Sequence, residues 1–134
     1  MPERIELNPE WPWAKAYRIS QGVRVGSTVY VSGQVAFDPQ GNVVGEGDMA
    51  AQARQVFSNL RTVLAEAGAT MDDVVKITTF LTDMSRFSDY AAARAEAFPN
   101  KIPASTAVAT PALVRPELLV EVEAIAEIGS GTPA

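Results

Sequence analysis

Hydrophobic residues recur every three or four positions between Asp48 and Gly68, which is the spacing of one face of an amphipathic helix. The positions are Met49, Ala53, Val56, Phe57, Leu60, Val63, Leu64 and Ala67. Asp48 is a favoured N-cap residue, and Gly68 suits the position just after a helix end. The pattern therefore predicts a helix over residues 48–68. A second, alanine-rich segment from Phe87 to Phe98 predicts another helix, which Pro99 would end.

Runs of β-branched and aromatic residues predict the strands. Residues 23–25 and 28–32 flank the dipeptide Gly26-Ser27, and a glycine at the first turn position suits a type II′ hairpin. Residues 34–37 are expected to extend the second strand, and a short edge strand is expected at residues 43–44. Further strands are predicted over residues 74–81, 105–109 and 118–128.

The predicted element order is β-β-β-α-β-α-β-β, an α+β fold in which two helices cover one face of a single mixed sheet. The last strand predicts the character of the other face. One set of alternate residues is apolar, whereas the other set is Glu121, Glu123, Ile125 and Glu127. A solvated sheet face accounts for these glutamates. A cleft also accounts for them, because a two-layer domain often buries its open face in an oligomer, where a carboxylate at the rim has a perturbed pKa.

The chain of 134 residues has the length of a single domain, with an N-terminal arm at residues 1–16 and a core at residues 17–128. Pro9 and Pro12 disfavour regular structure in the arm, and Trp11 and Trp13 need an apolar surface to cover. We therefore expect an irregular arm that docks on the core.

Composition narrows the possible functions. The chain has no His and no Cys, which removes imidazole bases, thiol nucleophiles, disulfides and the usual ligands of zinc, copper and iron. We therefore predict no metal site and no cofactor. The net charge of −5 disfavours nucleic acid as a partner. The sequence has no apolar stretch of about 18 residues and no signal-peptide pattern, so we expect a cytoplasmic protein that does not bind membranes.

Several segments together resemble the Rid (reactive intermediate deaminase, YjgF or L-PSP endoribonuclease-like) family from about Ser20 to Ile128. They are Val31-Ser32-Gly33-Gln34, residues 52–60 with 67–69, residues 73–76, residues 102–104 and residues 120–126. The resemblance implies a chorismate-mutase-like fold in a barrel-like homotrimer, with a small-molecule cleft between neighbouring subunits. In active members, water in that cleft hydrolyses the C=N bond of a small imino or enamino acid, and no cofactor is needed.

The resemblance also implies a role for individual residues. Glu121 is at the position of the catalytic glutamate that positions the water. The other expected lining residues are Ile19, Ser32, Gly33, Ala91, Arg94, Ser105, Thr106 and Ala107. Several of these depart from the family pattern, in which an arginine that binds the substrate carboxylate stands at Ser105, a cysteine at Ala107, tyrosines at Ile19 and Arg94, and an asparagine at Ala91.

The serine at position 105 changes the expected activity. A serine hydroxyl has neither the positive charge of a guanidinium nor its two parallel N–H donors. Losing a hydrogen bond between a guanidinium and a carboxylate weakens binding about 10- to 100-fold. Standard 2-imino acid deamination is thus expected to be weak or absent. Arg18, Arg94 and Arg115 could bring a guanidinium to the cleft, although each is also explained as a solvated surface residue, and Arg94 is our preferred replacement.

Three functions follow from these observations. The first is a hydrolase of a small imine, enamine or related C–N compound with non-standard specificity. The second is a trimer that binds a metabolite without chemistry, which the missing arginine, asparagine and tyrosines favour. The third is a ribonuclease, which the acidic charge and the absence of histidine disfavour.

Overall fold

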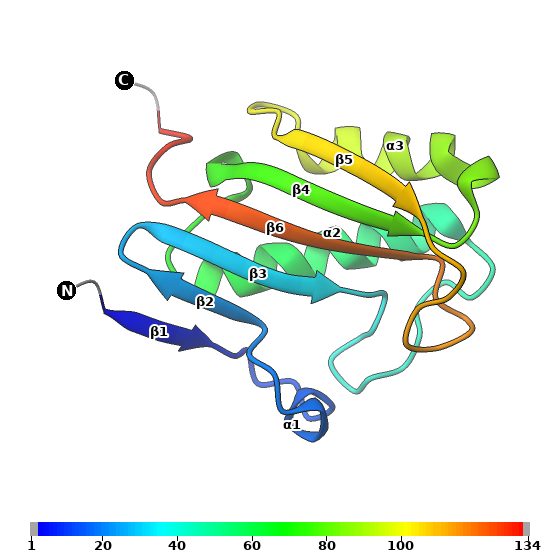
Figure 1. Cartoon of the computed structure of the whole chain (residues 1–134), viewed down its shortest axis with the longest axis horizontal. Helices are drawn as coiled ribbons and strands as arrows, with labels where there is room; N and C mark the ends of the chain where they lie inside the picture. The colour runs from blue at the N-terminus through cyan, green and yellow to red at the C-terminus, as the bar shows by residue number, and fades with distance from the viewer. Residues whose placement is uncertain (1–2, 133–134) are drawn as a thin grey trace.

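The structure is a computed structural model that describes residues 3–132, so the ends of the predicted domain, residues 1–2 and 133–134, lie outside the described residues. It contains one six-stranded sheet in the order β1-β2-β3-β6-β4-β5 (Figure 1). The strands are β1 (Arg4–Leu7), β2 (Gly22–Val25), β3 (Thr28–Gln34), β4 (Val74–Leu81), β5 (Ala104–Ala109) and β6 (Val120–Glu127). The α-helices are α1 (Ala14–Tyr17), α2 (Met49–Glu66) and α3 (Phe87–Ala97), and short 3-10 turns η1 (Met71–Asp73) and η2 (Met84–Arg86) precede β4 and α3.

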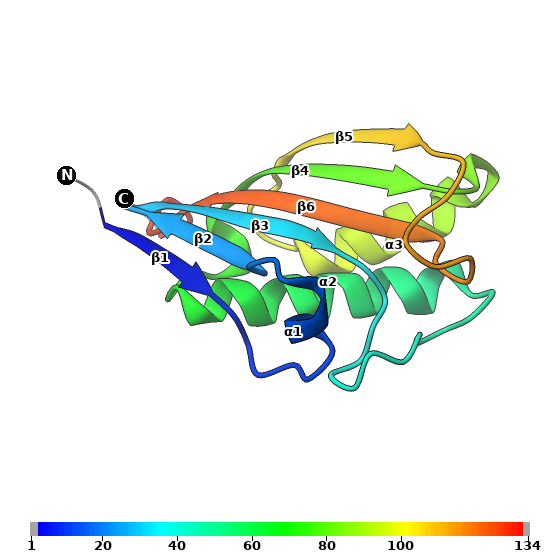
Figure 2. The same ribbon diagram turned by 60° about the horizontal axis from the view of Figure 1, so that its bottom comes forward.

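Helices α2 and α3 lie on the same face of the sheet, and no element of the described chain covers the other face (Figure 2). Strands β4 and β5 pair in parallel, whereas the other neighbours pair antiparallel. The predicted α+β class, the single mixed sheet and the two long helices on one face are therefore confirmed. None of the helices in residues 3–132 combines the length and the apolar run that crossing a bilayer requires.

The strongest local predictions are confirmed at residue level. The Asp48 carboxylate caps α2 by accepting a hydrogen bond of 3.1 Å from the Ala51 amide. The residue after the helix end, Gly68, has a φ of 74°, which explains the glycine there. In the β2–β3 hairpin only the first turn residue, Gly26, has a positive φ, at 59°, as a type II′ turn requires.

The predicted strand at residues 43–44 is wrong, and β3 ends at Gln34 instead of continuing to Phe37. A single bridge between Phe37 and Val43 is all that remains of the expected pairing. The side-chain amide of Asn59 on α2 donates to the carbonyls of Val35 and Phe37 at 3.0 and 2.9 Å. These bonds to a helix side chain accompany the end of β3 at Gln34, while residues 43–44 keep one backbone bond to the segment, from the Val44 amide to the Ala36 carbonyl at 2.8 Å.

The expectation of an irregular arm is wrong for two segments. Residues Arg4–Leu7 pair antiparallel with Gly22–Val25 as the edge strand β1, and Ala14–Tyr17 form the short helix α1. Pro9 and Pro12 lie between these segments, so they block neither one. The docking prediction is confirmed, since Trp11 and Trp13 stack with ring centroids 5.8 Å apart and the Trp13 ring meets the ring of Phe37.

Gln52 on α2 fixes the start of β6. Its side chain is fully buried, and its Nε2 donates to the carbonyls of Glu117 and Gly45 at 2.9 and 3.2 Å. Its Oε1 accepts from the Leu119 amide at 2.8 Å. One side chain thus satisfies three backbone groups, and two of them lie in the segment that leads into β6, the strand that carries the candidate catalytic glutamate.

We predict that Gln52→Ala lowers the free energy of unfolding by about 2–4 kcal/mol, because it leaves backbone groups unpaired and opens a cavity. Arg54→Ala on the same helix removes only an exposed ion pair with Glu96 and should change stability by less than about 1 kcal/mol. Equilibrium urea unfolding at fixed protein concentration measures both values. Equal stabilities for the two variants would contradict the role of Gln52.

Candidate functional site

A bulge in β3 brings Ser32 and Gly33 to the uncovered face of the sheet. Val31 pairs with Ala124 and Gln34 with Val122, so two residues of β3 stand opposite the single residue Glu123 of β6. The Gly33 backbone there packs against the Glu121 side chain. A Cβ at Gly33 would lie 2.8 Å from Glu121 Cδ and would overlap its Oε2. A Cβ at this position would therefore displace the Glu121 carboxylate, which in the structure rests on bare backbone.

Glu121 differs from the other glutamates of β6. It is half-buried, and burial, with a smaller contribution from the charge of Glu123, raises the pKa of its carboxyl. Glu127 has the opposite environment, because hydrogen bonds from the Thr28 and Ser27 hydroxyls lower the pKa of that carboxyl. Glu121 thus combines partial burial with a raised pKa, which favours the cleft interpretation over a uniformly solvated face.

Ser32 links the bulge to the segment that carries Ile19. Its hydroxyl donates to the Ser20 carbonyl at 2.6 Å, and its amide donates to the Gln21 carbonyl at 2.9 Å. Ile19, beside Ser20, is 53% exposed. The structure therefore brings one group of the predicted residues to one end of β3 and β6, which we call the glutamate half-site: Ile19, Ser32, Gly33 and Glu121.

A second group lies between β5 and α3. Ser105 and Ala107 stand opposite Ile77 and Thr79 in the parallel β4–β5 register. Both of these β4 residues are fully buried on the helix side, and the Thr79 hydroxyl bonds the Tyr90 hydroxyl of α3. Directly paired residues point to the same side of a sheet, so Ser105 and Ala107 face α3.

Arg94 completes this second group. Its Nη1 donates to Ser105 Oγ at 3.4 Å, and Ala91, one turn earlier on α3, lies on the same side of the helix. We call Ala91, Arg94, Ser105 and Ala107 the arginine half-site.

Thr106 belongs to neither group. It stands opposite Thr78, and Thr78 stands opposite Glu123, so Thr106 points to the uncovered face. Its hydroxyl accepts a hydrogen bond of 2.7 Å from the Lys76 ammonium.

The two half-sites lie on opposite faces of the sheet. Glu121 stands opposite Phe80 and points to the uncovered face, whereas Ser105 points to the helices. A single chain therefore does not bring Glu121 and the arginine half-site together.

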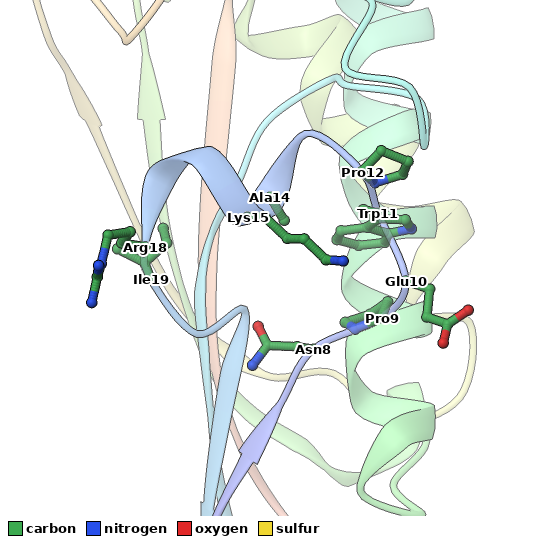
Figure 3. A pocket seen from close by; sticks show the side chains of 9 residues that line it. All are labelled: Asn8, Pro9, Glu10, Trp11, Pro12, Ala14, Lys15, Arg18 and Ile19. Carbon is green, nitrogen blue, oxygen red and sulfur yellow. The ribbon is translucent and has the colours of Figure 1, made fainter.

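The hollows of the chain lie elsewhere. The largest, of about 740 Å³, is bounded by the arm and α1, and Ile19 is its one predicted site residue. Figure 3 shows Trp11 and Pro12 at one end of this hollow and Arg18 and Ile19 at the other. A hollow of about 150 Å³ on the uncovered face is lined by Tyr30, Val31, Lys76, Thr78, Glu123, Ala124 and Ile125.

Sequence reasoning assigned no role to Tyr30 or Lys76. The alternation along β3 could have placed Tyr30 on the uncovered face, because it directly precedes the buried Val31. Within residues 3–132, no cluster of three or more acidic, His or Cys side chains could hold a metal ion.

The three candidate arginines differ in their contacts. Arg115 Nε lies 3.1 Å from a Glu117 carboxylate oxygen, so its charge is already paired. Arg18 is exposed and ends α1 in the left-handed region, with a φ of 52°. Of the three, Arg94 is the one that contacts a predicted site residue.

Comparison with known proteins gives a consistent match. The model of the family described as Endoribonuclease L-PSP matches residues 12–128, so the similarity begins within the arm and not at Ser20 as expected. A RutC family protein from Sulfurisphaera tokodaii is 38% identical over 110 residues, covering 82% of this chain and 87% of the relative. A RutC family protein from Pyrococcus abyssi is 37% identical over 107 residues, covering 80% of this chain and 84% of the relative.

Solved structures of related proteins indicate the same family. A member of the YjgF/YER057c/UK114 family from Mycobacterium tuberculosis is 32% identical, with a TM-score of 0.82 over 94% of this chain and 100% of that chain. A protein of the Rid family from Yersinia pestis is also 32% identical, with a TM-score of 0.87 and the same coverage. The predicted YjgF-type fold is therefore confirmed.

We predict that Gly33→Ala lowers the pKa of Glu121 toward its ordinary value. The added methyl displaces only the flexible end of Glu121, which then becomes more hydrated, so stability should fall by only about 1 kcal/mol. Carbon-detected NMR titration of the carboxyl groups measures the shift, and Glu127 serves as the internal control. A Glu121 pKa that stays raised in this variant would show that contact with Gly33 does not keep the carboxylate buried.

Proposed function

This chain belongs to the endoribonuclease L-PSP family, the family of the YjgF and Rid proteins, and from that premise we propose that it hydrolyses a small imine, enamine or related C–N compound. Glu121 is the catalytic residue in this proposal. The reaction takes place in a cleft between subunits of a homotrimer, with residues of both half-sites lining the cleft. The protein needs no cofactor for it, because a C=N bond is already electrophilic.

The observation that carries this proposal is the environment of Glu121. A half-buried carboxylate with a raised pKa is a stronger base than a solvated one, and it rests against bare backbone at Gly33. As a C–O bond forms between water and the imine carbon, Glu121 takes the proton that the water loses. It gives this proton to nitrogen as the C=N π bond opens, which forms a carbinolamine. Glu121 then moves the hydroxyl proton to nitrogen, and the C–N bond breaks to release ammonia and leave a carbonyl product.

The separation of the half-sites supports a site between subunits. The uncovered face carries exposed apolar side chains, with Tyr30 50%, Val108 40% and Ile125 36% exposed, and these need a partner surface. If this face packs on a second copy in a closed ring, the glutamate half-site of one chain can meet the arginine half-site of the next.

A second candidate function is metabolite binding without chemistry. It is favoured by Ser105, Ala91 and Ala107, whose short side chains offer little to hold a small substrate in a reactive geometry. Glu121 has no specific role in that alternative.

We predict that wild-type protein accelerates ammonia release from at least one member of a panel of imines and enamines, and that Glu121→Gln lowers kcat/KM by about 10²- to 10⁴-fold. Because Glu121 acts as a carboxylate, activity should fall as the pH drops through its raised pKa. The control Glu123→Gln keeps the base but removes a like charge, so its acid limb should move to lower pH. Unchanged activity in Glu121→Gln would reject Glu121 as the base, and no turnover of any compound would favour the binding role.

A mixing experiment tests whether the site is shared between subunits. Glu121→Gln removes the base, and Ser105→Trp fills the arginine half-site, so each variant alone should be inactive. Unfolding and reassembly as an equal mixture should recover about one quarter of wild-type sites, because each site takes one half from each of two chains. Recovery of no activity, with wild type reassembled in parallel as the control, would contradict a shared site.

A further inference from the structure

The hollow between the arm and α1 has the size of a small-molecule site, at about 740 Å³. Two stretches of chain, residues 8–12 and 14–19, form its sides (Figure 3). Five of the nine lining residues are apolar: Pro9, Trp11, Pro12, Ala14 and Ile19. The other four carry polar or charged groups: Asn8, Glu10, Lys15 and Arg18.

The walls of this hollow are held by contacts that need no ligand. Trp11 is only 8% exposed, and its ring stacks on the ring of Trp13, which also makes edge contacts with the rings of Tyr17 and Phe37. The Ala14 amide donates to the Trp11 carbonyl at 3.0 Å, which ties the start of α1 to the other wall. The hollow is therefore preformed.

The backbone at the end of α1 is strained. Arg18 has a φ of 52°, and every other residue of 3–132 with a positive φ is a glycine. A side chain in this region is disfavoured by sterics, and such a conformation persists only where the surrounding structure holds it, often beside a binding site. The turn at Arg18 brings the chain from α1 to Ile19, at one end of the hollow.

The hollow contains hydrogen-bond donors that lack acceptors. Asn8 Oδ1 accepts from the Gln21 amide at 3.1 Å, and this bond fixes the side-chain orientation so that Nδ2 keeps both of its hydrogens. Among residues 3–132, Asn8 Nδ2 finds no acceptor, and no carboxylate oxygen lies within 4.0 Å of Lys15 Nζ. In Figure 3 the Lys15 side chain runs from α1 toward Trp11, whereas the Glu10 carboxylate points away from the group.

The charge of the lining is opposite to that of the whole chain. Lys15 and Arg18 against Glu10 give the lining one net positive charge, whereas the chain carries −5. At physiological salt, charges more than about 8 Å away are largely screened. The local positive charge therefore decides which ligands the hollow attracts.

We propose that this hollow binds a small molecule that combines an apolar group with an anionic oxygen group. The apolar group packs against Trp11 and Ile19. The anionic oxygens accept hydrogen bonds from Lys15 Nζ and Asn8 Nδ2, which gives both donors the acceptors that the chain itself does not supply.

The hollow adjoins the segment that also forms the glutamate half-site. Ile19 belongs to both, and the carbonyl of Ser20 accepts the hydrogen bond from the Ser32 hydroxyl. The inference nevertheless goes beyond the proposed function, because binding in the hollow requires no chemistry at Glu121.

The two tryptophans of the chain give a direct readout, since Trp11 lines the hollow and Trp13 stacks behind it. Three probes are titrated into the assembled protein: phenyl phosphate, inorganic phosphate as the anion alone, and phenol as the ring alone. Isothermal titration calorimetry measures each affinity, and tryptophan emission reports binding at the arm. Phenyl phosphate should change the emission saturably and bind at least about 10-fold more tightly than either fragment, because only it contacts both the walls and the donors.

Two variants remove the donors one at a time. Lys15→Met keeps the apolar stem and should weaken phenyl phosphate binding about 5-fold, a modest loss because the ammonium is exposed. Asn8→Asp keeps an acceptor for the Gln21 amide but replaces the NH2 group by a negative oxygen, so it should weaken binding about 10-fold. Neither variant should change phenol binding. The control Lys101→Met removes the same charge from an exposed residue between α3 and β5 and should bind phenyl phosphate like wild type.

Several results would overturn the inference: no emission change with phenyl phosphate, an affinity no higher than for a fragment, or wild-type affinity in Lys15→Met or in Asn8→Asp. Glu121→Gln, which tests the hydrolase, should bind phenyl phosphate like wild type. Loss of binding in that variant would place the probe at the Glu121 carboxylate and not in the hollow. Failure of the hydrolase proposal would leave the binding results unchanged.

Discussion

The alternation of side chains along β6 is the constraint on which the rest of this structure depends. β6 lies between β3 and β4, so it pairs on both edges and cannot shift its register without losing both sets of hydrogen bonds. Its apolar residues, with Val120, Val122 and Ala126 fully buried, pack under the helices. The glutamates must therefore point to the uncovered face. The same pairing that builds the core thus places the carboxylates on the surface where we propose that the chemistry occurs.

The surroundings of β6 then distinguish one glutamate from the others. Gln52 fixes the backbone where the strand begins. The bulge in β3 places Gly33, which has no side chain, beside Glu121. Burial on that side raises the pKa of the carboxyl, whereas hydroxyl donors near the other end of the strand lower the pKa of Glu127. The bulge beside Glu121 and the hydroxyl donors beside Glu127 together create the difference.

The same sheet separates the two half-sites. Because β4 and β5 run in parallel with fixed register, Ser105 must follow Ile77 to the helix face while Thr106 follows Thr78 to the other. Arg94 reaches Ser105 because Tyr90, one turn before it on α3, is anchored to Thr79. A site between subunits is consistent with this geometry.

The sequence by itself determined the elements whose signals are local. Helix α2, strand β4 and the two faces of β6 follow from periodicity, because a residue's spacing to its neighbours fixes which side it faces. Tertiary structure decided whatever depends on distant partners. Asn59 of α2 binds the backbone that follows β3, the arm segment β1 pairs with β2, and packing of α3 on β4 and β5 places Arg94 beside Ser105. These outcomes depend on contacts between residues that are far apart in the chain, and the periodicity of a single segment contains no information about them.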